Sequence, residues 1–316
     1  MSGVEKEWAG EPGTLRIAVV GAGAVGSYYG GILAYAGEDV HFLLRSDYEA
    51  VCEQGMRIIR HGRDEFTIQP QVYNDSAKMG TFDVVIIAAK TTANDALVEV
   101  VRPLVGEGTV ILTLQNGMGN AEHWAKLAGG LERVMAGLCF VCINRTGPGI
   151  IENFMPGSIT LAKGVGAPQE RTRDFAARLL RAGSPMRLAD NLEEALWKKL
   201  VWNVPFNGLT IAAGGIDCGT VLASEALTSE VNALMREVQA AAAAYGHIIH
   251  DHFLAKQLEV TYPMKDYKPS SLIDYLDDKP VEVEAIWGVP LERAKAKGVA
   301  VPKMEMLHAL LEQVTV

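Results

Sequence analysis

Cysteine and long apolar runs are scarce in this sequence. Four cysteines in 316 residues are too few to cross-link a chain of this size, and disulfide-rich proteins belong to oxidising compartments. No run approaches the roughly 18 uninterrupted apolar residues that a membrane span needs. The first 13 residues lack the apolar core of a signal peptide. We therefore expect a cytoplasmic protein with a flexible tail over residues 1–14.

Positive charge is also in short supply. The 29 Lys and Arg residues are outnumbered by 38 Asp and Glu, which gives a formal net charge of −9. This excess disfavours a general surface for nucleic acid or anionic lipid, although local basic pockets remain compatible with it. The 49% of apolar and 21% of charged residues are ordinary for folded domains, and the length suits two of them.

Short apolar strands alternate with helical stretches up to residue 189. Buried strands are expected at 15–20, 39–44, 82–89 and 109–114, and a hairpin over 57–71 turns near His61 and Gly62. Further strands are expected at 134–144, 149–154 and 158–163, with helices at 94–104 and 168–182. This rhythm predicts a Rossmann-like, doubly wound parallel α/β sheet over residues 15–189.

The pattern changes near residue 190. From there to residue 316 the spacing of apolar residues predicts mainly helices, at 192–212, 222–245, 250–260, 282–297 and 303–314, with a loop over 262–271. We expect an all-helical second domain over residues 190–316.

A glycine-rich turn follows the first predicted strand and opens a helix. It consists of Gly21, Ala22, Gly23, Ala24, Val25 and Gly26. Gly21 permits a tight turn, Gly23 lets the backbone approach a pyrophosphate, and Gly26 lets the helix pack on the strand. The helix N-terminus also offers N–H donors to phosphate. The context predicts a dinucleotide site, with an unliganded turn as the alternative.

The end of the second predicted strand bears on the choice of dinucleotide. NAD sites usually carry an acid there for the ribose hydroxyls, whereas this chain has Arg45, nineteen residues after Gly26, followed by Ser46. A guanidinium suits a 2′-phosphate. Asp47 is the counter-evidence, since a slip of two residues restores an acid. Lys90 ends another buried strand and adds positive charge, so together these residues favour NADP(H).

A polar stripe marks the first helix of the second half. Lys199, Asn203 and Asn207 stand at i, i+4 and i+8, so on a helix they fall within an arc of roughly 80°. A lysine and two amides among apolar neighbours need partners when buried. The alternative is the solvated face of an amphipathic helix. Pro205 should kink this helix, because it removes a hydrogen bond.

These features together resemble the ketopantoate reductase (2-dehydropantoate 2-reductase) family. The motifs occur in the family's order over nearly the whole chain after the tail. They are Gly21-x-Gly-x-x-Gly26, Lys90, Gln115-Asn-Gly-Met-Gly119, Trp197-x-Lys-Leu-x-x-Asn-x-x-x-Asn207, Pro269-Ser-Ser271 and Glu282-Val-Glu-Ala-Ile286.

The resemblance implies a role for each matching residue. Lys199 would be the general acid, and Glu282 would help to hold substrate and lysine. Arg45 and Lys90 would bind the NADPH 2′-phosphate. Asn116 is assigned to both cofactor and substrate. The remaining substrate-binding residues would be Asn203, Asn207 and a serine of the pair Ser270 and Ser271.

Three positions depart from the family's pattern. The run from Ser270 to Asp274 is one residue shorter than usual, which leaves open whether Ser270 or Ser271 meets the substrate. Ala93 stands where many members carry glutamine, and Pro205 between the two asparagines is not typical. These departures concern substrate identity more than reaction type.

The implied reaction is the NADPH-dependent reduction of ketopantoate to pantoate, a small 2-oxo acid substrate. Hydride arriving at the 2-oxo carbon leaves an alkoxide that needs a positioned proton donor, and a lysine whose pKa is lowered by burial can supply the proton. The alternatives are a paralogous reductase of another 2-oxo acid and a non-catalytic NADP-sensing protein. The oligomeric state stays open, a homodimer included.

Two further groups of residues receive no function. Cys139 and Cys142 have the spacing of redox and zinc motifs, but they fall inside a predicted strand, where residues i and i+3 point to opposite faces. A second group lies just past a predicted helix end and consists of His247, His250, Asp251 and His252. Without a second cluster of ligands it is typical of a solvated turn, and we expect no metal.

Overall fold

The structure is a computed structural model that describes residues 14–315, so the expected tail lies outside the described residues except for Thr14. The chain forms two compact units. The first runs up to Gln115 and continues over Asn120–Leu192, and the second comprises Asn116–Gly119 and Glu193–Val316. The boundary expected after residue 189 thus lies at Leu192, and a four-residue segment from the middle of the first half belongs with the second unit.

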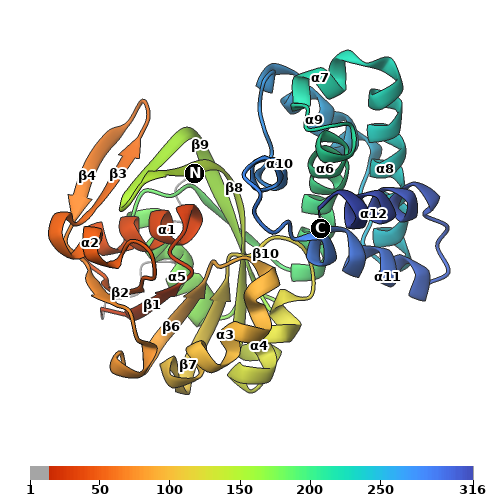
Figure 1. Ribbon diagram of the computed structural model, residues 1–316. Coiled ribbons are helices and arrows are strands. Elements are labelled where there is room, and N and C mark those ends of the chain that lie inside the picture. Colours follow the sequence, from red (N-terminus) through yellow and green to blue (C-terminus); the bar gives the residue numbers. More distant parts are fainter. Residues whose placement is uncertain (1–13, 316) are drawn as a thin grey trace, which may run out of the picture. The chain divides into compact units, whose positions relative to one another are not determined.

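The first unit is built on a mixed sheet (Figure 1). Within the described residues its strands are β1 (Arg16–Val20), β2 (Asp39–Leu43), β3 (Met56–Arg60), β4 (Asp64–Ile68), β5 (Gln71–Tyr73), β6 (Phe82–Ile87), β7 (Val105–Thr113), β8 (Val134–Gly147), β9 (Ile150–Lys163) and β10 (Met186–Ala189). Their order is β4-β3-β9-β8-β7-β6-β1-β2-β5, with β10 paired to β9. The run from β8 through β7, β6, β1 and β2 to β5 is parallel, which confirms the Rossmann-like prediction.

Five α-helices accompany this sheet in the described residues: α1 (Ala24–Tyr35), α2 (Tyr48–Gln54), α3 (Asn94–Val101), α4 (Asn120–Ala128) and α5 (Glu170–Arg181). Strands β1 and β6 are buried almost throughout, with Ile17, Val19 and Ile86 at 0% exposure. Their continuous apolar runs follow from this burial, because a parallel strand covered on both faces has no solvated side.

The β8–β9 hairpin is longer than the sequence indicated. Three short strands were expected between residues 134 and 163, whereas two antiparallel strands of 14 residues form. The pairing is irregular between Phe140 and Cys142 and again between Arg145 and Gly147. Such irregularities bend a hairpin, and this one extends across α1 to pair with β3 (Figure 1). Its tip is thereby brought to the β2–α2 turn, where Gly149 N–H donates to Asp47 at 3.0 Å.

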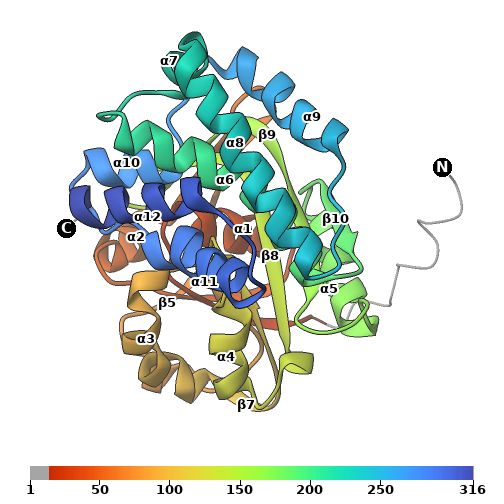
Figure 2. The ribbon, with the colours of Figure 1, turned by 90° about the vertical axis from the view of Figure 1, so that its right-hand side faces the viewer.

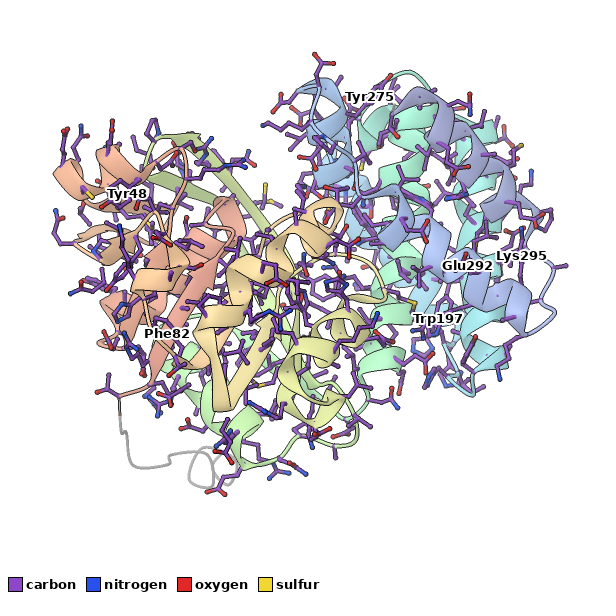
Figure 3. The ribbon with its side chains drawn as sticks, turned by 60° about the horizontal axis from the view of Figure 1, so that its bottom comes forward. Tyr48, Phe82, Trp197, Tyr275, Glu292 and Lys295 are labelled. Atoms are coloured by element: carbon purple, nitrogen blue, oxygen red, sulfur yellow. The ribbon has the colours of Figure 1, made fainter. Side chains whose placement is uncertain are left out.

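The second unit is helical (Figure 2). Its helices in the described residues are α6 (Leu192–Ala212), α7 (Cys218–Ala223), α8 (Glu225–Ala244), α9 (Asp251–Thr261), α10 (Ser270–Leu276), a π-helical turn at Glu284–Gly288, α11 (Val289–Ala296) and α12 (Pro302–Val314). The core gathers around α6, whose Trp197 is completely buried (Figure 3). None of the helices within residues 14–315 combines the length and apolarity of a bilayer span.

Several details of this unit differ from the sequence expectations. The helix expected over 222–245 is two helices, divided at Ser224, whose Oγ accepts from Leu227 N–H at 3.3 Å as the cap of α8. The loop expected over 262–271 ends early, because α10 begins at Ser270. The helix expected from residue 282 starts as a π-helical turn. Helix α6 continues past Pro205, which can donate no hydrogen bond to the carbonyl of Val201.

A buried ion pair joins the ends of two helices to the sheet of the first unit. Glu38, between α1 and β2, accepts from Arg178 of α5 at 2.7 Å and from Leu15 N–H at 3.1 Å. The two side chains are only 10% and 4% exposed, respectively. Arg178 also pairs with Asp174 of α5 at 2.8 Å, so loss of Glu38 would leave the buried guanidinium only partly compensated, which is costly.

We expect Glu38→Ala to lower the free energy of unfolding by about 2 kcal/mol, since Leu15 N–H loses its acceptor and the buried Arg178 keeps Asp174 but loses Glu38. Urea denaturation followed by circular dichroism measures this change. Glu99→Ala is the matched control, because its pair with Arg102 lies in solvent. A Glu38→Ala midpoint as close to wild type as that of Glu99→Ala would contradict the assignment.

Candidate active site

The glycine-rich turn lies at the carboxyl end of β1 and is fixed by close backbone contact. Gly21 has φ +85°, and a Cβ on it would stand 2.2 Å from the nitrogen of Ala89, so a side chain there would force the backbone to shift. A Cβ on Gly23, the N-cap of α1, would meet nothing within 4 Å. The N-terminus of α1 therefore opens onto free space and has no acidic residue in its first turn. This geometry fits a pyrophosphate.

The candidate cofactor-binding cations lie at the same edge of the sheet. Strand β1 lies between β6 and β2 and is parallel to both, so the three carboxyl ends are neighbours. Arg45 follows β2 and is exposed, with no hydrogen bond or ion pair to any residue within 14–315. Lys90 follows β6, directly after Ala89, and is half-buried. Both cations thus follow strands that are direct neighbours of β1, the strand that leads into the glycine turn.

Asp47, the residue that argued for NAD, is occupied by structural contacts. Its side chain is 8% exposed and accepts hydrogen bonds from Gly149 N–H, from Arg145 and from Ser46. Burial raises the pKa of this carboxyl, but the donors from Gly149, Arg145 and Ser46 outweigh burial and hold the pKa below its usual range. The carboxylate is therefore ionised and turned to the β8–β9 hairpin, and Arg45 is left as the exposed group at the strand end.

Lys199 is buried on α6 and has a specific partner. Only 7% of the residue is exposed, and its Nζ donates to Asn116 Oδ1 at 2.8 Å. The neighbouring Lys198 differs in both respects, since its side chain is 41% exposed and pairs with Glu194, one turn earlier on α6, at 2.5 Å. Of these two adjacent lysines, Lys199 is therefore buried in the core around α6, and Lys198 is not.

The loop that carries Asn116 is anchored to the π-helical turn. Gly117 has φ +80°, and a Cβ there would stand 2.2 Å from the carbonyl oxygen of Ala285. Met118 N–H donates to that same oxygen at 2.8 Å. These contacts leave room only for glycine and hold Asn116 against Lys199. Glu282, two residues before the turn, is 4% exposed, and its carbonyl accepts from Ile286 N–H at 3.2 Å.

The two asparagines of α6 are buried but serve different contacts. Asn207 is 2% exposed, and its Oδ1 accepts from Ser271 N–H at 3.0 Å, which ties α10 to α6. Asn203 is 8% exposed, yet its amide forms no hydrogen bond to any described residue. A nearly buried amide needs a partner, so Asn203 is suited to meet a ligand or water.

The structure also separates the two serines that the sequence left open. Ser271 is buried beside Asn207, whereas Ser270 is exposed at the start of α10. Asp274, on the same short helix, is 8% exposed and was not among the predicted site residues. The sequence could have indicated Asp274 through its spacing. It follows Ser270 by four residues and Ser271 by three, so on a helix its side chain lies on the same face as theirs.

The groups to which no function was assigned contribute no site in the described residues. Cys139 and Cys142 lie on β8 and form no disulfide with a described residue. His250 and His252 stack on each other with ring centres 5.5 Å apart. Within residues 14–315 no three His, Cys, Asp or Glu side chains are grouped so that they could hold a metal.

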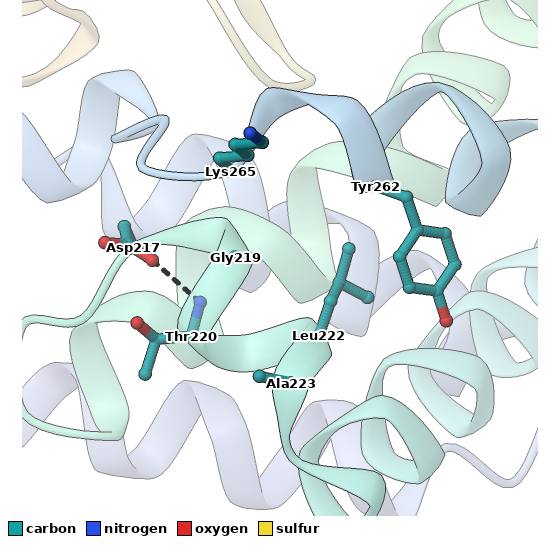
Figure 4. A pocket seen from close by; sticks show the side chains of 7 residues that line it. All are labelled: Asp217, Gly219, Thr220, Leu222, Ala223, Tyr262 and Lys265. Carbon is teal, nitrogen blue, oxygen red and sulfur yellow. Dashed lines mark hydrogen bonds between the residues drawn. The ribbon is translucent and has the colours of Figure 1, made fainter.

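A separate hollow of about 520 Å³ lies between α7 and the chain after α9 (Figure 4). It is lined by Asp217, Gly219, Thr220, Leu222, Ala223, Tyr262 and Lys265. None of these is a predicted site residue. Asp217 is committed to capping α7, where it accepts from Thr220 N–H at 2.7 Å.

Comparisons with known proteins match each of the two units to the same family. The family profile described as Ketopantoate reductase PanE/ApbA matches residues 17–166, and the one described as Ketopantoate reductase PanE/ApbA C terminal matches residues 191–315. A 2-dehydropantoate 2-reductase from Nostoc sp. is 39% identical over 305 residues, which cover 94% of each chain.

Solved structures extend the likeness to the fold. The 2-dehydropantoate 2-reductase from Geobacter metallireducens GS-15 is 43% identical and superimposes with a TM-score of 0.91 over 95% of this chain and 100% of that one. A D-mandelate dehydrogenase, described with NADH and anilino(oxo)acetate, shares the fold alone, with a TM-score of 0.86 at 21% identity over 95% of this chain and 98% of that one. The chain belongs to the ketopantoate reductase family of oxidoreductases.

Proposed function

We propose that this protein reduces 2-dehydropantoate (ketopantoate) to pantoate with NADPH, and that Lys199 is the general acid. The observation that carries the proposal is the buried Lys199, held by Asn116 at 2.8 Å on the helix face that also bears Asn203 and Asn207. The substrate follows from the names of the Nostoc and Geobacter relatives. The product would serve pantothenate and coenzyme A biosynthesis in the cytoplasm.

The residues of the second unit divide the chemical work. Bound NADPH supplies the hydride for the 2-oxo carbon, so the carbonyl oxygen gains negative charge and needs a proton. Lys199 holds that proton at Nζ, and Asn116 orients the ammonium group by accepting one of its three donors. The unpartnered amide of Asn203 binds the substrate, and so does a serine of the α10 pair that Asn207 positions. Glu282 helps to hold lysine and substrate.

The first unit binds the dinucleotide. The turn from Gly21 to Gly26, with the N–H groups at the start of α1, receives the pyrophosphate. Arg45 and Lys90 flank this turn at adjacent strand ends and bind the 2′-phosphate. The structural role of Asp47 supports NADPH over NADH, because its carboxylate is engaged by Arg145 and Gly149 and is not available to the ribose hydroxyls.

A paralogous reductase of another 2-oxo acid is the second candidate. It is favoured by the shortened run from Ser270 to Asp274, since these residues shape the substrate end of the proposed site. The fold itself decides nothing here, because the D-mandelate dehydrogenase shares it. A non-catalytic NADP sensor is disfavoured, because it would have no use for a buried lysine with a dedicated amide partner.

A panel of 2-oxo acids, assayed by NADPH oxidation, tests the substrate. We expect ketopantoate to give the highest kcat/KM in a series that also contains 2-oxoisovalerate, pyruvate and benzoylformate. A higher kcat/KM for another member would favour the paralogous reductase, and no oxidation with any of them would favour the sensor.

The cofactor proposal predicts a preference of at least tenfold for NADPH over NADH in kcat/KM, which corresponds to about 1.4 kcal/mol. Arg45→Glu should abolish most of this preference, because it replaces the exposed guanidinium with a charge that repels the 2′-phosphate. Initial rates with both cofactors measure it. Equal efficiency of NADH and NADPH in the unmodified protein would refute the proposal.

The acid proposal predicts that Lys199→Ala lowers kcat by roughly 10²–10⁴, the range for losing a general acid. The dissociation constant for NADPH should change little, since Lys199 belongs to the other unit. Steady-state kinetics and a fluorescence titration measure the two quantities.

Lys198→Ala is the built-in control for Lys199→Ala. Its side chain is largely solvated and pairs with Glu194, so the variant should keep nearly the wild-type rate. The assignment fails if folded Lys199→Ala retains most of its kcat, or if the Lys198 variant is the one that loses activity.

A further inference from the structure

A second guanidinium stands at the end of β2, delivered by a distant part of the chain. Arg145 lies near the tip of the β8–β9 hairpin, 98 residues after Asp47 in sequence, and donates to the Asp47 carboxylate. The same Nη1 is 3.4 Å from Ser46 Oγ. Because Ser46 is adjacent to Arg45, the hairpin brings Arg145 to the turn where the 2′-phosphate is proposed to bind.

Arg145 keeps most of its hydrogen-bonding capacity for another partner. All of its side-chain hydrogen bonds with described residues are made through Nη1, so Nε and Nη2 donate to no residue within 14–315. These two nitrogens carry three N–H donors. The side chain is 42% exposed, so solvent and a ligand can reach it.

Asp47 holds the Arg145 side chain in place, and its own negative charge is balanced by that arginine. The carboxylate is 8% exposed and accepts from Gly149 N–H at 3.0 Å and from Ser46 Oγ at 2.9 Å, so two donors besides Arg145 hold it in place. Without Arg145, a carboxylate two residues from Arg45 would lower the positive potential there and repel a phosphate. With Arg145 present, the turn carries two positive charges against one negative charge.

We propose that Arg145 is a specificity-determining residue that binds the 2′-phosphate of the dinucleotide through its Nε–Nη2 edge, while its Nη1 is held by Asp47. This inference rests on the proposed use of NADPH. An arginine that pairs with a carboxylate on one side can present a planar pair of donors to phosphate on the other. Arg45 and Arg145 then contact the phosphate from two different segments of the chain.

The alternative is a purely structural strap that ties the hairpin to the β2–α2 turn. The two roles predict different results. A strap would support the whole cofactor site, so its loss would weaken NADPH and NADH together. A phosphate ligand would affect only the dinucleotide that carries the 2′-phosphate.

The test measures dissociation constants by calorimetry on the full chain, without turnover. The ligands are NADPH, NADH, 2′,5′-ADP and 5′-AMP. We expect Arg145→Met to weaken NADPH and 2′,5′-ADP by about tenfold, and to change NADH and 5′-AMP by less than about twofold. Arg145→Lys, which keeps a charge but loses the planar pair of donors, should fall between wild type and Arg145→Met.

Further variants distinguish a failure of the Arg145 inference from a failure of the proposed use of NADPH. Asp47→Asn removes the negative charge and should leave the NADPH preference equal to or above that of wild type. Equal weakening of NADPH and NADH in Arg145→Met and Arg145→Lys would establish the strap instead. If Arg45→Glu abolishes the preference and Arg145→Met leaves it intact, only this inference falls. If wild type binds NADPH and NADH equally, the proposed cofactor falls with it.

Discussion

The hydrogen bond between Lys199 and Asn116 is the interaction on which the helical unit depends. An ammonium group that is 7% exposed inside a helical core is costly unless an acceptor is held against it. The acceptor here comes from a loop that can approach only because Gly117 has no side chain and Met118 N–H reaches the carbonyl of Ala285. The π-helical turn provides this carbonyl. The glycine and the π-helical turn thus both help to hold the amide that accepts from Lys199.

The sheet unit relies on a different device, the bending of one long hairpin. The pairing along β8 is irregular, and the hairpin extends across α1 to β3, where Arg145 reaches the β2–α2 turn. The cofactor end of the first unit is therefore assembled from the Rossmann-like strands and from a segment that the simplest Rossmann pattern does not contain. Charge at this end is balanced by residues far apart in sequence, since Asp47 is engaged by Arg145 and Gly149 of the hairpin.

Sequence reasoning was strongest where burial acts on every residue of an element. Strands β1 and β6 carry continuous apolar runs because both faces are covered there, and the stripe of Lys199, Asn203 and Asn207 is regular because α6 is a single helix. Short helices such as α2 and α10 were not predicted, because seven residues show too little periodicity to distinguish a helix from a loop. The contact between Lys199 and Asn116 and the occupation of Asp47 depend on long-range packing, which no local pattern encodes.

The segment Asn116–Gly119 has a consequence for how the protein could be divided. It belongs to the helical unit although the chain on both sides of it belongs to the sheet unit, so the backbone passes between the units three times. A cut after Leu192 would give a C-terminal fragment that lacks both the amide partner of its buried lysine and the loop that fills the space beside Ala285. The two units are therefore not exchangeable modules. A chimaera that grafts the helical unit of one relative onto the sheet unit of another would have to transplant these four residues as well.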